Sequence, residues 1–157
     1  LIQSWSGYSH STHDFNLPEL NLEIKSSISD KMEINVSSFN QLMPKPNSQT
    51  YLIYQRFMKD EHCNQSKDIF ELISSIKTII QKKETAKLFD RKLEIFGINQ
   101  ISLKLKLSKI NLLIFHINET FPSLKSTKIH GSISNIKYKI DLSKCSEWLT
   151  ELNLNEL

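Results

Sequence analysis

The segment from Leu20 to Ser26 alternates strictly between apolar and polar residues, and no other pattern constrains the fold of this chain as much. The apolar set is Leu20, Leu22 and Ile24, and the polar set is Asn21, Glu23 and Lys25. Successive side chains of a β-strand point to opposite faces, so residues two apart share a face. We therefore predict a strand with one apolar face, on whose other face Glu23 and Lys25 project together.

A second carboxylate, Asp14, precedes Glu23 by nine residues and falls in a shorter predicted strand, 13–17. If the two strands pair, Asp14, Glu23 and Lys25 converge at one edge of a sheet. Carboxylate oxygens suit Mg²⁺ or Mn²⁺, which can activate a water to attack a phosphodiester. A neighbouring ammonium can orient that water or stabilise developing negative charge. The bland alternative is a solvated face with a surface ion pair between Glu23 and Lys25, worth about 0 to 1 kcal/mol.

The rest of the first hundred residues alternates between strand and helix patterns. A short strand is predicted at 33–37, with Ile34 and Val36 inward, followed by a helical turn at 38–43. Residues 51–57 are almost continuously apolar, which is typical of a strand covered on both faces. Two helices are predicted at 68–81 and 83–96 from their apolar spacing, and we expect them to pack as a pair.

The capping signals of these helices support the assignment. Asp68 and Glu71 offer a capping box for the first helix, and Gly97 ends the second. Beyond residue 100 the period returns to two. Residues 101–107 are expected to form a hairpin with 110–117, a third strand at 135–142 to join them, and 146–152 to form a short terminal helix.

Length and composition indicate one α/β domain without extreme properties. The 157 residues include 39% hydrophobic ones, enough for an ordinary core, and the net charge of +3 permits a nucleic-acid partner without requiring one. Cys63 and Cys145 belong to no C-x-x-C pair, and no apolar run reaches 18 residues, so we expect a cytoplasmic protein without a membrane span. P-loop, G-x-G-x-x-G and G-x-S-x-G motifs are absent.

The stretch from Trp5 to Leu42 resembles the bacterial PD-(D/E)XK motif proteins found in restriction and phage-defence gene clusters. The stretches that carry the resemblance are Trp5, Gly7, His13-Asp14-Phe15, Glu23-Ile24-Lys25-Ser26-Ser27, Ser37-Ser38 and Gln41-Leu42. Phe121-Pro122 and the stretch 138–142 look like the C-terminal region of that family. Two features depart from the pattern: His13 stands where the motif has Pro, and a helix that often supplies another acid would lie ahead of Leu1.

The resemblance implies a fold, an activity and a set of site residues. The fold would be a restriction-endonuclease-like three-layer core at 1–98, a mixed sheet flanked by helices, with 99–157 as an α+β extension of the same domain. The activity would be DNA cleavage that depends on Mg²⁺ or Mn²⁺, as part of restriction or phage defence, with other subunits of such a system as further partners. Asp14 and Glu23 would bind the metal, Lys25 would be the catalytic lysine, and Gln41 would line the site.

For several of these assignments a second interpretation stays open. Ser26, Ser27 and Ser38 would donate to phosphate oxygens, or they end strands and cap the next helix. Lys104 and Lys106 would contact the DNA backbone, or they protect a sheet edge. Gln41 is a site residue or a helix-surface amide. His13 contacts a phosphate or only packs locally. The whole protein is a nuclease, or a catalytically inactive subunit that binds DNA or other proteins.

Overall fold

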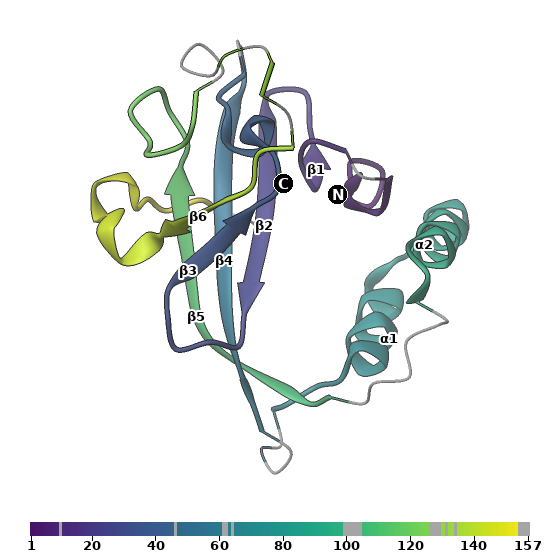
Figure 1. The fold of residues 1–157 in the computed structure, drawn as a ribbon. Coiled ribbons are helices and arrows are strands. Elements are labelled where there is room, and N and C mark those ends of the chain that lie inside the picture. Colours follow the sequence, from purple (N-terminus) through teal and green to yellow (C-terminus); the bar gives the residue numbers. More distant parts are fainter. Residues whose placement is uncertain are drawn as a thin grey trace.

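The structure is a computed structural model that describes residues 1–9, 11–45, 47–60, 63, 65–98, 105–125, 130, 132–133 and 135–153. Its main sheet has four strands in the order β1-β2-β4-β5 (Figure 1). These strands are β1 (Phe15–Asn16), β2 (Leu20–Ser27), β4 (Gln49–Lys59) and β5 (Leu107–His116). Strands β2 and β4 are parallel and the other neighbours are antiparallel, so the sheet is mixed.

A second, two-stranded sheet lies over one face of the main sheet. It is formed by β3 (Glu33–Val36) and β6 (Tyr138–Asp141), which pair antiparallel. Strand β3 and the 3₁₀ turn η2 (Phe39–Leu42) belong to the crossover that joins β2 to its parallel neighbour β4. The largest core cluster fills the space between the two sheets and includes Val36, Leu42, Leu52 and Phe115. The crossover therefore covers the face of β2 that carries the polar side chains.

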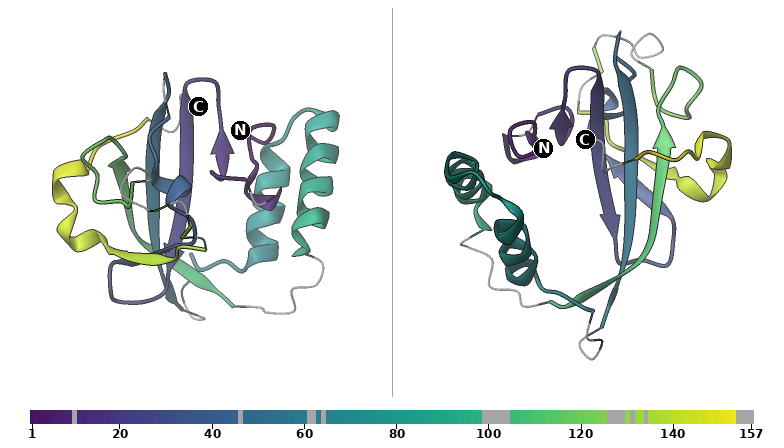
Figure 2. Two further views of the ribbon diagram at one scale, coloured as in Figure 1. Left: turned by 45° about the horizontal axis from the view of Figure 1, so that its top comes forward. Right: turned by 180° about the vertical axis from the view of Figure 1, so that it is seen from behind.

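The two helices, α1 (Ile69–Ile79) and α2 (Lys83–Phe96), lie on the other side of the main sheet, together with the N-terminal segment (Figure 2). Asp68 and Glu71 form the predicted capping box of α1, and Gly97 ends α2 with a φ of 80°. Phe89 and Leu93 of α2 pack against Ile69 and Ile73 of α1, so the predicted helix pair is confirmed.

The C-terminal third of the chain differs from the prediction. Residues 107–116 are one continuous strand along β4, so the predicted hairpin turn near residues 108 and 109 is wrong; residues 101–104 lie outside the described residues. The strand predicted at 135–142 exists as β6, but it pairs with β3 and not with β5. The helix predicted at 146–152 shortens to one 3₁₀ turn, η6 (Ser146–Trp148), and a further 3₁₀ turn, η5 (Leu142–Lys144), precedes it.

The molecule is a mixed α/β structure, as predicted. Strands from both sides of residue 98 pair within each sheet, and the division into a core at 1–98 and an extension at 99–157 stays a prediction. Among the helices that the structure describes, none has the length and apolar character that crossing a membrane requires.

Candidate active site

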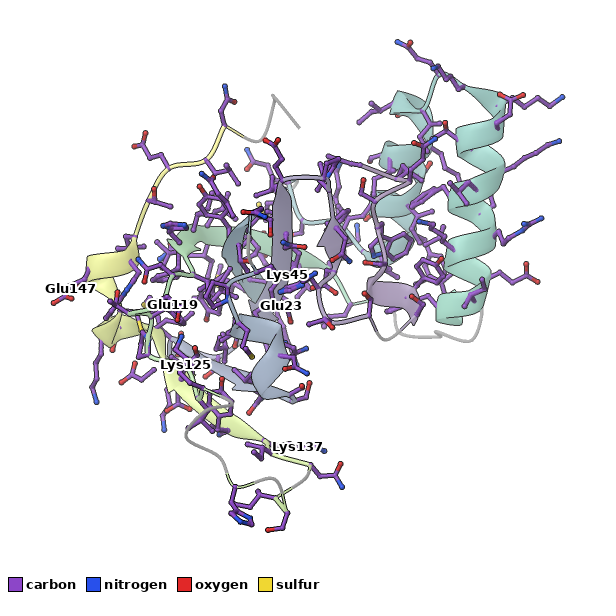
Figure 3. All side chains as sticks on the ribbon, turned by 90° about the horizontal axis from the view of Figure 1, so that it is seen from above. Glu23, Lys45, Glu119, Lys125, Lys137 and Glu147 are labelled. Atoms are coloured by element: carbon purple, nitrogen blue, oxygen red, sulfur yellow. The ribbon has the colours of Figure 1, made fainter. Side chains whose placement is uncertain are left out.

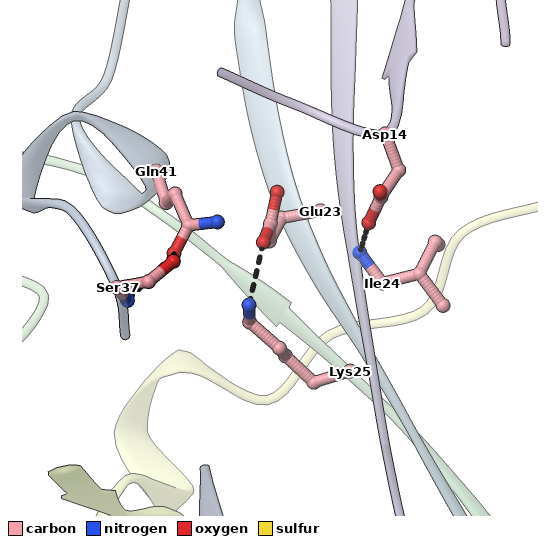
Figure 4. A network of polar contacts seen from close by, with 6 residues as sticks. All are labelled: Asp14, Glu23, Ile24, Lys25, Ser37 and Gln41. Carbon is pink, nitrogen blue, oxygen red and sulfur yellow. Dashed lines mark hydrogen bonds and ion pairs between the residues drawn. The ribbon is translucent and has the colours of Figure 1, made fainter. Parts of the chain in front are cut away.

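Pairing of β1 with β2 brings Asp14 to Glu23. The register joins Phe15 to Leu22 and Asn16 to Asn21, so Asp14, one residue before β1, falls opposite Glu23. The Asp14 side chain continues this pairing, because its Oδ2 accepts a hydrogen bond of 2.8 Å from the backbone N–H of Ile24 (Figure 4). The structure therefore brings Asp14 opposite Glu23, as the predicted pairing of the two strands requires.

Glu23 is almost fully buried, with 2% of its surface exposed. It lies opposite Leu52 of β4, on the face of the sheet that the crossover covers. Burial raises the pKa of Glu23 to about 7, because desolvation penalises the carboxylate; the ammonium of Lys25 opposes this shift and the charge of Asp14 adds to it. The carboxyl group of Glu23 therefore keeps its proton to a higher pH than an exposed glutamate does, even with Lys25 beside it.

Lys25 forms an ion pair with Glu23. Its Nζ lies 2.8 Å from Glu23 Oε1, and 20% of the lysine side chain is exposed against 3% of the glutamate's. The interpretation as a weak pair on a solvated face is therefore wrong, because the Glu23 side chain has lost its contact with water. The Lys25 side chain thus keeps contact with solvent while its ammonium stays next to the buried carboxylate.

Gln41 faces the two residues from η2. Its Oε1 accepts hydrogen bonds from the backbone N–H of Ser37 at 3.0 Å and from the Ser37 hydroxyl at 3.2 Å. With the oxygen held in this way, the amide nitrogen points toward Glu23 (Figure 4). The side chain is thus held with its N–H donor on the side of Glu23, and a role of Gln41 in the site stays a prediction.

The N-terminal segment fixes Asp14 from the other side. The backbone carbonyl of Asp14 accepts hydrogen bonds from the N–H groups of Ser6, at 2.7 Å, and Gly7, at 3.1 Å. Gly7 also lies directly against the carboxylate, since a Cβ at this position would be 2.3 Å from Asp14 Oδ1. Residue 7 must therefore lack a side chain for Asp14 to keep this position.

The three candidate serines make local contacts. Ser38 caps η2 by accepting from the N–H of Asn40, and the Ser27 hydroxyl accepts from the N–H of Ser29. Ser26 is exposed and, by the alternation of β2, points away from the face of Glu23 and Lys25. Ser27 shares the face of Lys25, so it is the better placed of the two neighbours for a phosphate contact.

The candidate lysines lie elsewhere. Lys104 is outside the described residues. Lys106 is 3.6 Å from Glu71 of α1 and precedes Leu107, the first residue of β5. From Leu107 to Leu113, which lies opposite Tyr54, the partner of Lys25, a strand rises about 20 Å. Lys106 therefore cannot share a phosphate with Lys25, and a DNA-backbone contact by Lys106 stays a prediction.

Two further basic side chains, His13 and Lys45, lie near the carboxylates. His13 is 1% exposed, and the backbone of Gln41 is the nearest hydrogen-bonding group to its ring, although not in good hydrogen-bond geometry. Burial and then the charge of Lys45 lower the pKa of His13 to about 4, and the backbone of Gln41 opposes this shift, so a contact of His13 with phosphate as a cation is disfavoured.

Lys45 itself is held beside β2, where Figure 3 labels it together with Glu23. Its Nζ donates to Asn21 Oδ1 at 3.1 Å and to Asn16 Oδ1 at 3.2 Å. Asn21 belongs to the polar row predicted from the alternation, but nothing in the local sequence indicates that Lys45 reaches it from 24 residues away.

The donor set suits a hard divalent cation. Asp14 and Glu23 offer oxygen ligands, and the described residues contain no group of three or more His, Cys, Asp or Glu side chains that could hold a metal. Mg²⁺ and Mn²⁺ accept one or two carboxylates together with water and phosphate oxygens, whereas a zinc site needs a fuller set of protein ligands. Buried Glu23, with its raised pKa, would gain a compensating charge from such an ion.

A comparison with known families agrees with this geometry. The model of the family described as "Putative PD-(D/E)XK family member (DUF4420)" matches residues 1–143. The matched range contains every residue of the site described above. No curated protein and no solved structure matches the chain.

Proposed function

The chain belongs to the family described as "Putative PD-(D/E)XK family member (DUF4420)", whose model spans residues 1–143, and we propose that it is a metal-dependent deoxyribonuclease. Proteins with this motif are typically nucleases that use divalent metals. Asp14 and Glu23 would bind Mg²⁺ or Mn²⁺, and Lys25 would be the catalytic lysine. The proposal includes a restriction-endonuclease-like three-layer core and a place in restriction or phage defence, with DNA and other subunits of such a system as partners.

One observation supports the proposal: Asp14, next to β1, lies opposite the buried Glu23 of β2, and Glu23 pairs with the partly exposed Lys25. A structural ion pair would need only Glu23 and Lys25. Asp14 adds a like charge that raises the pKa of Glu23 and so works against that pair. An arrangement that costs stability in this way is typical of a site that binds a cation.

The residues of the chain divide the work by position. Asp14 and Glu23 would hold the ion, which would supply a water of lowered pKa and neutralise charge on the phosphodiester. Lys25, beside Glu23 and partly exposed, can exchange its ion pair for the substrate and stabilise the negative charge that develops on a phosphate oxygen. The amide nitrogen of Gln41 points toward the same region and can orient a water by donating a hydrogen bond to it.

The experiment is nicking of supercoiled plasmid DNA with Mg²⁺ or Mn²⁺, by the wild-type protein and by its Lys25→Ala and Asp14→Asn variants at equal folded concentration. We expect cleavage by the wild type and loss of at least about a hundredfold in both variants, the scale of losing a positioned electrostatic group. Lys87→Ala, an exposed lysine of α2, is the matched control and should cleave like the wild type.

Binding of Mn²⁺, measured by calorimetry on the same proteins, separates the two functions proposed for this fold. A catalytically inactive subunit that binds DNA or protein has no need of an ion at Asp14 and Glu23. If the wild type neither cleaves DNA nor binds Mn²⁺ in a way that depends on Asp14, the nuclease proposal fails and the inactive subunit takes its place.

A further inference from the structure

Lys92 of helix α2 is a buried lysine without an acidic partner in the structure described. Only 5% of its surface is exposed, and its Nζ donates to three backbone carbonyls of the N-terminal segment: Ile2 at 2.8 Å, Gln3 at 3.1 Å and Trp5 at 2.5 Å. The ring of Tyr8 lies 5.0 Å from the same nitrogen. All three N–H groups of the ammonium are therefore used, and an aromatic face covers the remaining side.

The three carbonyls that accept hydrogen bonds from Lys92 belong to one tight turn. The N–H of Trp5 donates to the carbonyl of Leu1 at 3.0 Å, and the Trp5 ring packs on Phe89 and Phe96 of α2. Burying an ammonium costs several kcal/mol unless hydrogen bonds satisfy it. An apolar residue would anchor the turn without that cost, so the lysine specifies where the backbone of residues 2–5 lies rather than merely attaching it.

The same segment continues directly to Asp14. The carbonyl of Ser4 accepts from the N–H of Asn16 at 2.9 Å, and Trp5 forms an antiparallel bridge with Phe15. The N–H groups of Ser6 and Gly7 then donate to the carbonyl of Asp14. One side of Asp14 is thus held by the N-terminal segment, and its carboxylate on the other side accepts from the N–H of Ile24 in β2.

We propose that Lys92 is a positioning residue for Asp14: its ammonium fixes the carbonyls of residues 2–5, and the segment so placed holds the Asp14 carboxylate at β2. Lys92 itself touches neither substrate nor metal. The importance of this role for catalysis rests on the proposed function, but the positioning of Asp14 does not. Helix α2, on one side of the sheet, thereby controls the geometry of a site on its edge.

The hydrogen bond from Ile24 N–H to Asp14 Oδ2 reports this position without any metal. Amide hydrogen exchange is measured by NMR in EDTA on the full chain, for wild type, Lys92→Met and the control Lys87→Met, an exposed lysine on the same helix. Met keeps the length of the side chain and removes the donors. We expect the Ile24 amide to exchange at least about tenfold faster in Lys92→Met, with the Leu52 amide of the central strand unchanged. Lys87→Met should match the wild type.

Equal acceleration at Ile24 and Leu52 would mean that Lys92 contributes only to global stability, and unchanged exchange at Ile24 would mean that Asp14 is held without it; either result overturns the proposal. If Lys92→Met does not fold, native-state exchange of the wild type in mild denaturant decides. The amides of Ser6, Gly7 and Ile24 should then open as one unit, and separate opening of Ile24 overturns the proposal.

Calorimetry with Mn²⁺ links this result to the site. A displaced Asp14 should weaken the affinity of Lys92→Met for Mn²⁺ about tenfold or more, while Lys87→Met keeps it. If the wild type binds no Mn²⁺ through Asp14, the proposed nuclease function is wrong, but the exchange result on Lys92 is unaffected. An unchanged Mn²⁺ affinity in a Lys92→Met protein whose Ile24 amide is deprotected would overturn the link between positioning and the metal.

Discussion

The Cα of Gly7 lies against the carboxylate of Asp14, so closely that a Cβ on residue 7 would be 2.3 Å from Asp14 Oδ1. Real Cβ atoms do not approach an oxygen so closely, and the atom that would have to move is the end of a short side chain hydrogen-bonded to Ile24. The Gly in the N-terminal loop is therefore explained by close approach and not by an unusual backbone angle. It makes the position of the Asp14 carboxylate sensitive to a single methyl group.

Gly7→Ala should move the Asp14 carboxylate while the rest of the fold survives. Crowding by one methyl group typically costs about 1 to 3 kcal/mol, and rotation of the Asp14 side chain can relieve part of it. We expect affinity for Mn²⁺, measured by calorimetry, to fall at least about tenfold. Thr12→Ala, at an exposed position in the same loop, should bind like the wild type. Equal Mn²⁺ affinity of the Gly7 variant would show that Asp14 is not a ligand.

The raised pKa of Glu23 makes the stability of the metal-free protein depend on pH. A carboxyl group whose pKa is about 7 in the folded state binds its proton more tightly there than in the unfolded chain. Its contribution to the free energy of unfolding is present in full below about pH 4.5 and is lost as the pH rises through about 7. Glu23→Gln keeps the shape of the side chain and cannot ionise. The free energy of unfolding of the variant minus that of the wild type should therefore increase from pH 5 to pH 8.

Urea unfolding in EDTA at these two pH values measures this difference. We expect it to grow between pH 5 and pH 8 by an amount on the order of 1 to 3 kcal/mol. Glu94→Gln, an exposed position on α2, serves as the control and should show no such change. A difference for Glu23→Gln that is constant between pH 5 and pH 8 would contradict the raised pKa.

Lys25→Met should separate metal binding from catalysis. The lysine is a cation that pairs with Glu23 at 2.8 Å, and a bound metal would compete with it for the same carboxylate. We therefore expect Mn²⁺ affinity that is equal to or greater than that of the wild type, together with loss of nicking. Loss of Mn²⁺ binding in a folded Lys25→Met protein would show that the lysine has a structural role in the metal site.

Asp68→Ala tests the fold away from the site. Asp68 accepts from the N–H of Glu71 at 2.9 Å, and the Glu71 carboxylate accepts from the N–H of Asp68 at 2.8 Å. Removing this capping box should lower the free energy of unfolding by about 1 kcal/mol, with Mn²⁺ affinity unchanged. Asp68→Ser preserves a capping oxygen and should retain most of the stability. A change in Mn²⁺ affinity would mean that α1 is coupled to the site more strongly than its contacts indicate.

The helices were predictable because their signals are local. Apolar spacing and the Asp68 and Gly97 caps mark α1 and α2 within a few residues of their ends. Strand β2 and its two faces followed from a period of two in the same way. The continuous strand β5 was missed because a hairpin and a single long strand share the same alternation. Which of the two forms depends on the unpaired edge of the central strand β4, with which β5 pairs. That strand lies far earlier in the sequence, so the local pattern does not reveal it.

The sequence by itself determined that Glu23 and Lys25 share a face of one strand, and that Asp14 lies next to the short strand before it, because alternation and short connections act over a few residues. The tertiary structure alone decided that this face is buried, that Gln41 points toward Glu23, and that Lys92 holds the N-terminal turn. It also paired β3 with β6, two strands from opposite ends of the chain. Burial and pairing of this kind depend on which distant surfaces meet, and no local pattern encodes that choice.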